Sequence, residues 1–238
     1  MERRDHLWPG GPVFYFSDRA MKPSTDSFLL ADFTRLHRGD TVVDLGMGSG
    51  LLEVLLLARE PGARITGIEL DEDACVLARR TLEENRMDAK AICGDLRETP
   101  SLFPRGTAEA VVCNPPYFTP GSGAVAPGSR GTMRAELTAT LEEVCAAASA
   151  ALKYGGRFTL VYRVQRLADL VGACRAQGLE PKRMRLVQHR RESIPELVLL
   201  ECRKGGHPGL AVEPTLLLEN DDGTETEDVK RAYFRDKE

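Results

Sequence analysis

The sequence predicts an α/β fold in which a mostly parallel sheet is covered by helices on both faces. Short β-branched runs alternate with apolar-periodic stretches that are long enough to form helices. Glycine-rich and polar motifs follow directly after several predicted strands, which is where open α/β sheets bind ligands. The last two predicted strands have no helix between them, so we expect them to form an antiparallel hairpin.

The length and composition are typical of one soluble globular domain. The chain has 238 residues, of which 42% are hydrophobic and 29% are charged. No run approaches 18 apolar residues, which argues against a membrane-spanning helix, and residues 1–16 lack the apolar core of a signal peptide. Six widely spaced cysteines form no C-x-x-C pair. We therefore expect reduced, buried thiols, no metal centre and a cytoplasmic location.

The order of the elements follows from periodicity and from turn residues. Strands are expected at residues 41–46, 63–70, 88–95, 107–114, 157–163, 181–188 and 194–204. Helices are expected at residues 49–62, 71–87, 135–156 and 165–178. Ser49 is a candidate cap for the first of these helices, and Pro61 and Gly62 would end it.

The flanking segments are less regular. Residues 1–40 are interpreted as an irregular or partly helical lead-in over a ligand site, residues 41–206 as the main domain, and residues 207–238 as an acidic tail that is disordered or a short helix. The Gly/Pro/Ser-rich stretch at 119–133 is interpreted as a loop with a functional role.

The net charge of −4 hides two regions of opposite sign. Residues 151–191 carry ten Lys or Arg against two acids, a local balance of +8. Residues 211–238 carry nine acids against four bases, a local balance of −5. The basic stretch is compatible either with solvated charges on element surfaces or with a phosphate-binding surface, and the sequence leaves both open.

A glycine motif follows the first predicted strand. In "VVDLGMGSGLL", Gly46, Gly48 and Gly50 stand between a strand and a helix. Glycines at this point allow a tight turn and close approach of a ligand to the backbone. The spacing differs from the G-x-G-x-x-G of dinucleotide sites, and no G-K-[ST] for a nucleoside triphosphate is present.

Acidic residues stand at or near the carboxyl ends of this strand and of the predicted strands that follow it. Glu69 ends the second strand, 19 residues beyond Gly50, where its carboxylate could accept from both hydroxyls of an adenosine ribose. Asp95 ends the third strand and could accept from the exocyclic amine of an adenine. Asp44 precedes the glycines and could position an ammonium group, directly or through water.

With these features the chain resembles the class I S-adenosylmethionine-dependent methyltransferases over about residues 40–203. The resemblance implies a Rossmann-like, seven-stranded, mostly parallel sheet with an antiparallel final strand. It also implies S-adenosylmethionine as cofactor and S-adenosylhomocysteine as product. This cofactor has no phosphate, so a phosphate-cradling glycine pattern is not needed.

The stretch "VVCNPPYFTP" ends the fourth strand with Asn114, Pro115, Pro116 and Tyr117. It matches the [DNS]-P-P-[YFW] motif of enzymes that methylate adenine N6, cytosine N4 or glutamine N5. Two oxygens, the Asn114 side-chain carbonyl and the Pro115 main-chain carbonyl, would hold the two N–H groups of an amine whose lone pair is otherwise delocalised. Tyr117 and Phe118 offer faces on which a planar substrate can stack.

Other stretches of the sequence, less specific than the NPPY motif, resemble the bacterial tRNA(Val) adenine N6-methyltransferases. They are "MKPSTDSFLLADF" at 21–33, Arg134 and Glu136 after the loop, and "HRRESIPELVLLECRKGG" at 189–206. The resemblance implies transfer to an adenine in the anticodon loop of tRNA, with Thr25 and Asp26 near the cofactor, although a helix cap explains these two equally well.

The tRNA would then contact basic side chains of the loop and the basic stretch: Arg130, Arg134, Lys182, Arg183 and Arg190. Three alternatives stay open: a protein glutamine N5-methyltransferase, another DNA or ribosomal RNA amino-methyltransferase, and a cofactor-binding module without catalysis. The oligomeric state is not determined by these patterns.

Overall fold

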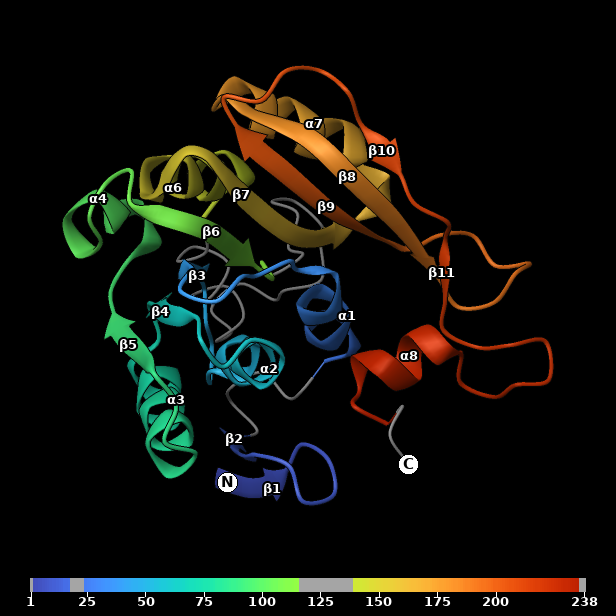
Figure 1. The fold of residues 1–238 in the computed structure, drawn as a ribbon, viewed down its shortest axis with the longest axis horizontal. Helices are drawn as coiled ribbons and strands as arrows, with labels where there is room; N and C mark the ends of the chain where they lie inside the picture. The colour runs from blue at the N-terminus through green and yellow to red at the C-terminus, as the bar shows by residue number, and fades with distance from the viewer. Residues whose placement is uncertain (1, 18–23, 116–138, 236–238) are drawn as a thin grey trace, which may run out of the picture.

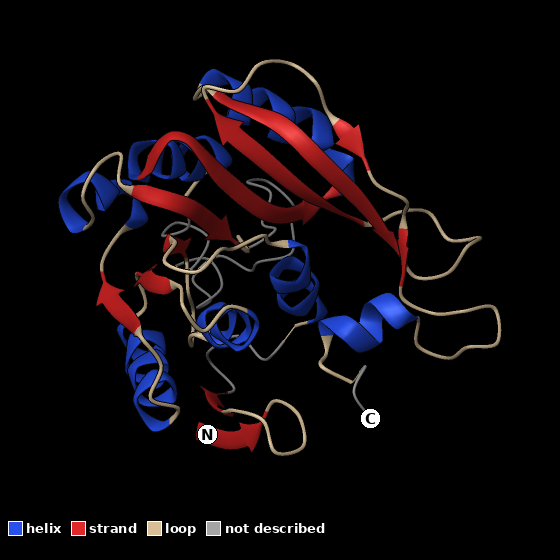
Figure 2. Ribbon diagram, in the orientation of Figure 1, coloured by secondary structure: helices blue, strands red, loops and turns tan. Residues whose placement is uncertain are grey.

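A nine-stranded sheet with helices on both faces forms the body of the molecule (Figures 1 and 2). The computed structural model describes residues 2–17, 24–115 and 139–235. The strands of the main sheet are β3 Thr41–Leu45, β4 Arg64–Glu69, β5 Ala89–Cys93, β6 Ala108–Cys113, β7 Leu152–Arg163, β8 Leu179–Gln188, β9 Leu197–Lys204, β10 Ala211–Val212 and β11 Leu216–Leu217. The helices are α1 Thr25–Phe33, α2 Leu51–Arg59, α3 Glu72–Glu84, α4 Thr99–Leu102, α6 Leu141–Ala151, α7 Leu167–Ala176 and α8 Glu227–Ala232, with short 3₁₀ turns η1 Leu96–Glu98 and η2 Val164–Arg166.

The strand order is β10-β8-β9-β7-β6-β3-β4-β5, with β11 also paired to β8. The central strands run parallel, and β9 lies antiparallel between β7 and β8. This confirms the predicted parallel sheet, its antiparallel final strand and the hairpin of the last two predicted strands. The two short strands β10 and β11 raise the count above the predicted seven.

Two apolar clusters hold the layers together. One face of the sheet packs against α6 and α7 and includes Leu45, Val111 and Phe158. The other packs against α1, α2 and α8 and includes Val42 and Leu55. Alternate residues of β3 thus enter different clusters, because neighbouring side chains of a strand point to opposite faces.

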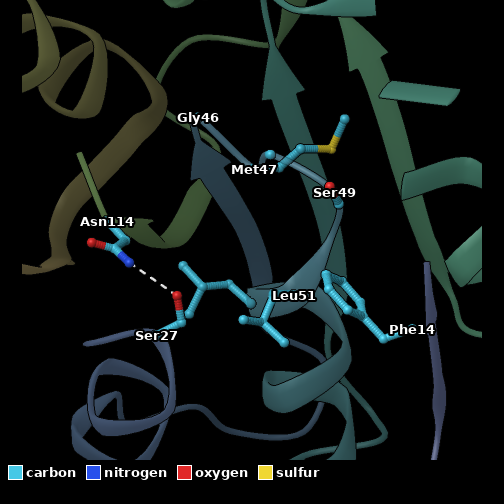
Figure 3. A pocket seen from close by; sticks show the side chains of 9 residues that line it. Phe14, Ser27, Gly46, Met47, Ser49, Leu51 and Asn114 are labelled. Carbon is cyan, nitrogen blue, oxygen red and sulfur yellow. Dashed lines mark hydrogen bonds between the residues drawn. The ribbon is translucent and has the colours of Figure 1, made fainter. Parts of the chain in front are cut away.

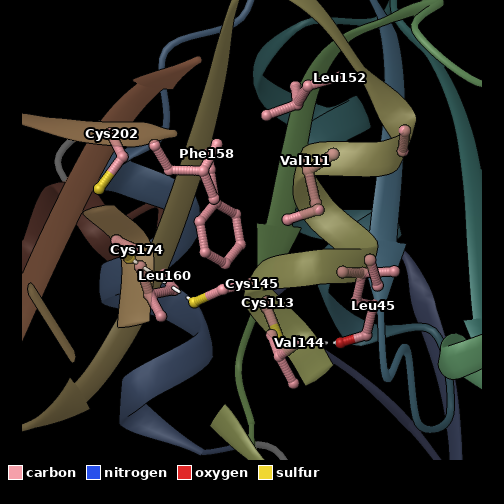
Figure 4. Close-up of a cluster of buried hydrophobic side chains, with 14 of the residues drawn as sticks. Leu45, Val111, Cys113, Val144, Cys145, Leu152, Phe158, Leu160, Cys174 and Cys202 are labelled. Atoms are coloured by element: carbon pink, nitrogen blue, oxygen red, sulfur yellow. Dashed lines mark hydrogen bonds between the residues drawn. The ribbon is translucent and has the colours of Figure 1, made fainter. Parts of the chain in front are cut away.

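All six cysteines are free. Cys145, Cys174 and Cys202 gather in the first cluster, where the Sγ atoms of Cys145 and Cys174 are 3.7 Å apart (Figure 4). Burial raises the pKa of the Cys113 thiol, which keeps it neutral and suits an apolar environment.

The four predicted helices are shorter in the structure than in the sequence prediction, and the difference is largest for α6. The helix expected at 135–156 is α6, which begins after Thr140 in a capping box with Glu143 and ends at Ala151, where the chain continues directly into β7. Ser49 does not cap α2, because the N-cap position belongs to Gly50 in the left-handed conformation.

The lead-in and the acidic segment are both folded onto the body. The lead-in contains an antiparallel hairpin, β1 Glu2–His6 with β2 Val13–Ser17, followed by α1. In the acidic segment, β10 and β11 extend the sheet beside β8, and α8 packs against α1 through the stacked rings of Phe28 and Tyr233, whose centroids are 4.2 Å apart. None of the described helices is long and apolar enough to cross a membrane.

Candidate active site

The glycine motif forms the turn between β3 and α2 at the carboxyl edge of the parallel strands. Gly46, Gly48 and Gly50 have φ values of 82°, 57° and 87°, a region that favours glycine. The main-chain N–H groups of Gly46 and Met47 donate to the Ile68 carbonyl at 2.9 and 3.2 Å. The turn is therefore anchored to the end of the neighbouring strand β4.

Glu69 ties the same turn to the start of the next loop. Its Oε2 accepts a hydrogen bond from the N–H of Gly48 at 2.9 Å, and its Oε1 accepts from the N–H of Asp71 at 2.9 Å. The carboxylate is half-buried at the end of β4. It is thus held in place by backbone donors beside the glycine turn, where the sequence predicts a ribose contact.

Asp95 has local partners at the end of β5. It caps η1 by accepting from the Arg97 N–H at 2.9 Å, and its carboxylate pairs with the Arg97 guanidinium. These hydrogen bonds lower the pKa of Asp95, so the carboxylate stays ionised. An adenine amine would have to share this carboxylate with Arg97.

Asn114 lies directly after β6 and is oriented from another element. Its Nδ2 donates to the hydroxyl of Ser27 on α1 at 2.9 Å, and the Asn114 side chain is 7% exposed (Figure 3). The neighbouring Pro115 is buried. The bond to Ser27 fixes which side of the amide carries the nitrogen, and hence which side carries the carbonyl oxygen.

A pocket joins Asn114 to the glycine turn (Figure 3). Its lining consists of Phe14, Ser27, Gly46, Met47, Gly48, Ser49, Leu51, Leu52 and Asn114. The hairpin contributes Phe14 and α1 contributes Ser27, so the lead-in forms one wall of this pocket. The sequence reasoning missed both residues, although Ser27 stands within the quoted stretch at 21–33.

Buried acids lie beneath the turn. Asp44 and Glu53 are 0% exposed, and no described residue hydrogen-bonds to any of their four carboxyl oxygens or to the Ser49 hydroxyl. Burial, with the charge of Glu53 second, raises the pKa of Asp44 well above its ordinary value. Burial also raises the pKa of Glu53 to about 7. The sequence analysis did not select Glu53, although it is the one charge in the leucine-rich run at 51–57.

The structure gives the predicted site residue Thr25 other surroundings. The Thr25 hydroxyl hydrogen-bonds with the Tyr233 hydroxyl on α8 at 2.9 Å, and Thr25 does not line the pocket. Asp26 lies in the first turn of α1. Tyr117, Phe118, Arg130 and Arg134 lie outside the described residues.

The basic stretch is mostly neutralised. Of its ten cations, nine lie within 4.0 Å of an acid, and only Lys182 has no acid that close among the described residues; its Nζ donates to the His207 carbonyl. Arg190 pairs with Glu219 at the surface.

Arg183 is a correction to the predicted substrate contacts. Its side chain is buried, donates to the Phe33 carbonyl and to Glu201 and Glu213, and stacks over the Phe33 ring. A guanidinium with these partners stabilises the fold and is not available to a nucleic acid.

A family model described as the methyltransferase small domain matches residues 14–172. The tRNA1(Val) (adenine(37)-N6)-methyltransferase of Tolumonas auensis is 31% identical over 204 residues, covering 80% of this chain and 83% of that protein. The protein of the same name from Porphyromonas gingivalis strain ATCC 33277 is 31% identical over 193 residues, covering 77% and 75%.

Solved structures share the fold. A predicted O-methyltransferase from Agrobacterium tumefaciens aligns with a TM-score of 0.72 at 22% identity, covering 89% of this chain and 96% of that one. TrmN from Thermus thermophilus aligns with a TM-score of 0.54 at 22% identity, covering 76% and 48%. At these identities the likeness concerns the arrangement of the sheet and helices.

Proposed function

Because the chain belongs to the methyltransferase small domain family, we propose that it transfers a methyl group from S-adenosylmethionine to the exocyclic N6 amine of an adenine in the anticodon loop of tRNA. The observation that carries the proposal is Asn114, held by Ser27 in a pocket beside the glycine turn. The names of the relatives support tRNA as the polymer and adenine as the base.

The residues present fit this cofactor. The buried Asp44 carboxyl has no hydrogen-bond donor among the described residues, and the cofactor's ammonium group would provide one. The glycine turn leaves its main chain open to close approach, and Glu69, held beside that turn, would accept from the ribose hydroxyls. When bound, the cofactor supplies an electrophilic methyl group on a sulfonium.

Asn114 and Pro115 would orient the acceptor amine. The Asn114 carbonyl oxygen and the Pro115 main-chain oxygen accept the two N–H groups, which turns the nitrogen lone pair toward the methyl carbon. Ser27 keeps the amide from rotating, because the Nδ2 group is already engaged at 2.9 Å. Alignment of this kind can account for about 7–11 kcal/mol of a barrier. No strong base is required, because the proton can leave after transfer.

The same two acceptors select the substrate. A keto oxygen would meet two carbonyl oxygens without a donor, so an amine is favoured over guanine O6. An adenine in an anticodon loop is already unpaired, so moving it into a pocket costs little free energy compared with a duplex.

The test offers labelled S-adenosylmethionine with tRNA, duplex DNA, ribosomal RNA or a release-factor protein, followed by digestion and identification of the product. We expect N6-methyladenosine from tRNA alone. Methylglutamine from the protein would replace the proposal with glutamine N5 methylation, and N6-methyladenine from DNA or ribosomal RNA would replace the substrate. Cofactor binding without transfer to any of these polymers would contradict enzymatic activity.

A further inference from the structure

Glu53 occupies a space that the sheet leaves open. Asp44 on β3 is directly paired with Gly67 on β4. A Cβ added to Gly67 would lie 2.3 Å from Glu53 Oε1, so any larger residue there would displace the carboxyl group. Because Gly67 on β4 has no side chain, the carboxyl group of Glu53 from α2 fits beside Asp44.

The two acids face the same side of the sheet. Val42, two residues before Asp44, belongs to the cluster that packs against α2, and side chains two apart in a strand share a face. Glu53 lies in the first turn of α2, the helix that packs on that face. Each acid affects the pKa of the other, and yet no hydrogen bond of ordinary geometry satisfies their oxygens among the described residues.

Among the described residues, no cation bears on the pair. The other described titratable groups that bear on it are Glu69 from β4 and Cys113 from β6. The Cys113 thiol donates to the Leu45 carbonyl at 3.0 Å and is neutral. Helix α1, which packs on α2, contributes the neutral Ser27 to the adjoining pocket. Two buried acids so placed cannot both ionise cheaply.

We propose that Asp44 and Glu53 share a proton in the cofactor-free protein and release it to solvent when the ammonium group of S-adenosylmethionine binds. The inference rests on the proposed function and adds Glu53 to it as a positioning residue that acts through Asp44. The ammonium brings a positive charge to the pair, which then needs no proton. The proton leaves for the buffer, and no bond of the cofactor changes.

The expected signature is a pH-dependent affinity. When ligand binding releases one proton, the association constant rises about tenfold for each unit by which the pH is raised. This should hold between about pH 5.5 and 6.5, where the cofactor's α-amino group is still protonated. The dissociation constant should therefore fall about tenfold across this window in the wild-type protein.

Calorimetric titration with S-adenosylmethionine, in two buffers that differ in ionisation enthalpy, measures the proton release directly. We expect about one proton for the wild type at about pH 6. Glu53→Gln should release fewer at the same pH, because Asp44 stays buried but loses the repulsion of Glu53 and so ionises at lower pH. The double variant Asp44→Asn/Glu53→Gln has no carboxyl group left to titrate, so it should release close to none, and its dissociation constant should change less than about twofold over the window. Glu83→Gln on the exposed face of α3 removes the same charge away from the pair and should behave as wild type.

A matched ligand tests the role of the ammonium without any substitution. Methylthioadenosine keeps the nucleoside and lacks the amino-acid group, so its binding to the wild type should release no proton. Equal release with both ligands, or cofactor binding without release in the wild type, would overturn the inference and leave the methyltransferase function standing. Failure of S-adenosylmethionine to bind in every buffer would overturn the proposed function and this inference together.

Discussion

Sequence patterns single out two regions of this molecule, the carboxyl edge of β3, β4 and β6 and the basic stretch that contains β8, and the fold treats them differently. At the strand edge the glycine turn, Glu69 and Asn114 come together around one pocket or its rim. On β8 and just beyond it, the described cations predicted to form a surface for RNA meet acids instead, with the exception of Lys182. Four of those acids come from the carboxyl-terminal segment: Glu213, Glu219, Asp221 and Asp228.

The difference lies in what brings the relevant partners together. Residues at consecutive ends of parallel strands share an edge whatever the intervening helices contain. The surface potential around a cluster of charges cannot be predicted in this way. Segments that are distant in the sequence can pack beside the cluster and place opposite charges next to it. The local balance of +8 at 151–191 therefore does not describe the potential of the folded protein.

Loss of the Asn114 amide should have the largest effect and tests the strand-edge half of this comparison. In Asn114→Ala we expect the single-turnover rate of methyl transfer to fall at least about 10³-fold, roughly 4 kcal/mol, because the amine loses one of its two aligned acceptors. Cofactor affinity, measured by titration, should stay within about threefold of wild type. A variant with full transfer activity would remove Asn114 from the mechanism.

Arg183→Met tests the other half through stability. Removing one partner of a buried ion pair leaves Glu201 uncompensated, so we expect the free energy of unfolding to fall by about 3 kcal/mol in a urea titration. Arg190→Met, at the exposed pair with Glu219, is the matched control and should leave the free energy of unfolding nearly unchanged. Unchanged stability in Arg183→Met, with weaker tRNA binding and a shallower salt dependence, would restore the predicted RNA contact.

The buried acid Glu53 should make the stability of the cofactor-free protein depend on pH. Its pKa is raised from 4.5 to about 7 on folding, so the folded state binds more protons in this window and loses stability as pH rises. Relative to wild type, Glu53→Gln should therefore gain on the order of 2 kcal/mol between about pH 5 and pH 7. Thermal melts at both pH values measure this, and a pH-independent difference would show that Glu53 does not titrate there.

Glu69→Ala should have the smallest of these effects. It removes the acceptor proposed for the ribose and the hydrogen bond that holds the Gly48 N–H, so we expect cofactor affinity to weaken more than tenfold, about 1.4 kcal/mol. Glu72→Ala, three residues further at the exposed start of α3, is the matched control and should leave the affinity unchanged. An unaltered dissociation constant in Glu69→Ala would reject the ribose assignment.

The sequence by itself determined the alternation of strands and helices, the parallel sheet with its antiparallel hairpin, and the chemistry at the strand ends. Periodicity and turn residues act over a few positions, so they can be recognised without the partner segments. The glycine turn, Glu69 at the end of β4 and Asn114 after β6 all follow from such local signals.

Only the tertiary structure decided which distant side chains meet. Ser27 holds Asn114 from 87 positions away, Glu53 lies in the gap left by Gly67, and Arg183 is enclosed by Phe33, Glu201 and Glu213. Such contacts depend on how helices and terminal segments pack across the sheet. A buried polar group must find its partner wherever the packing places one, and no pattern of neighbouring residues specifies that place.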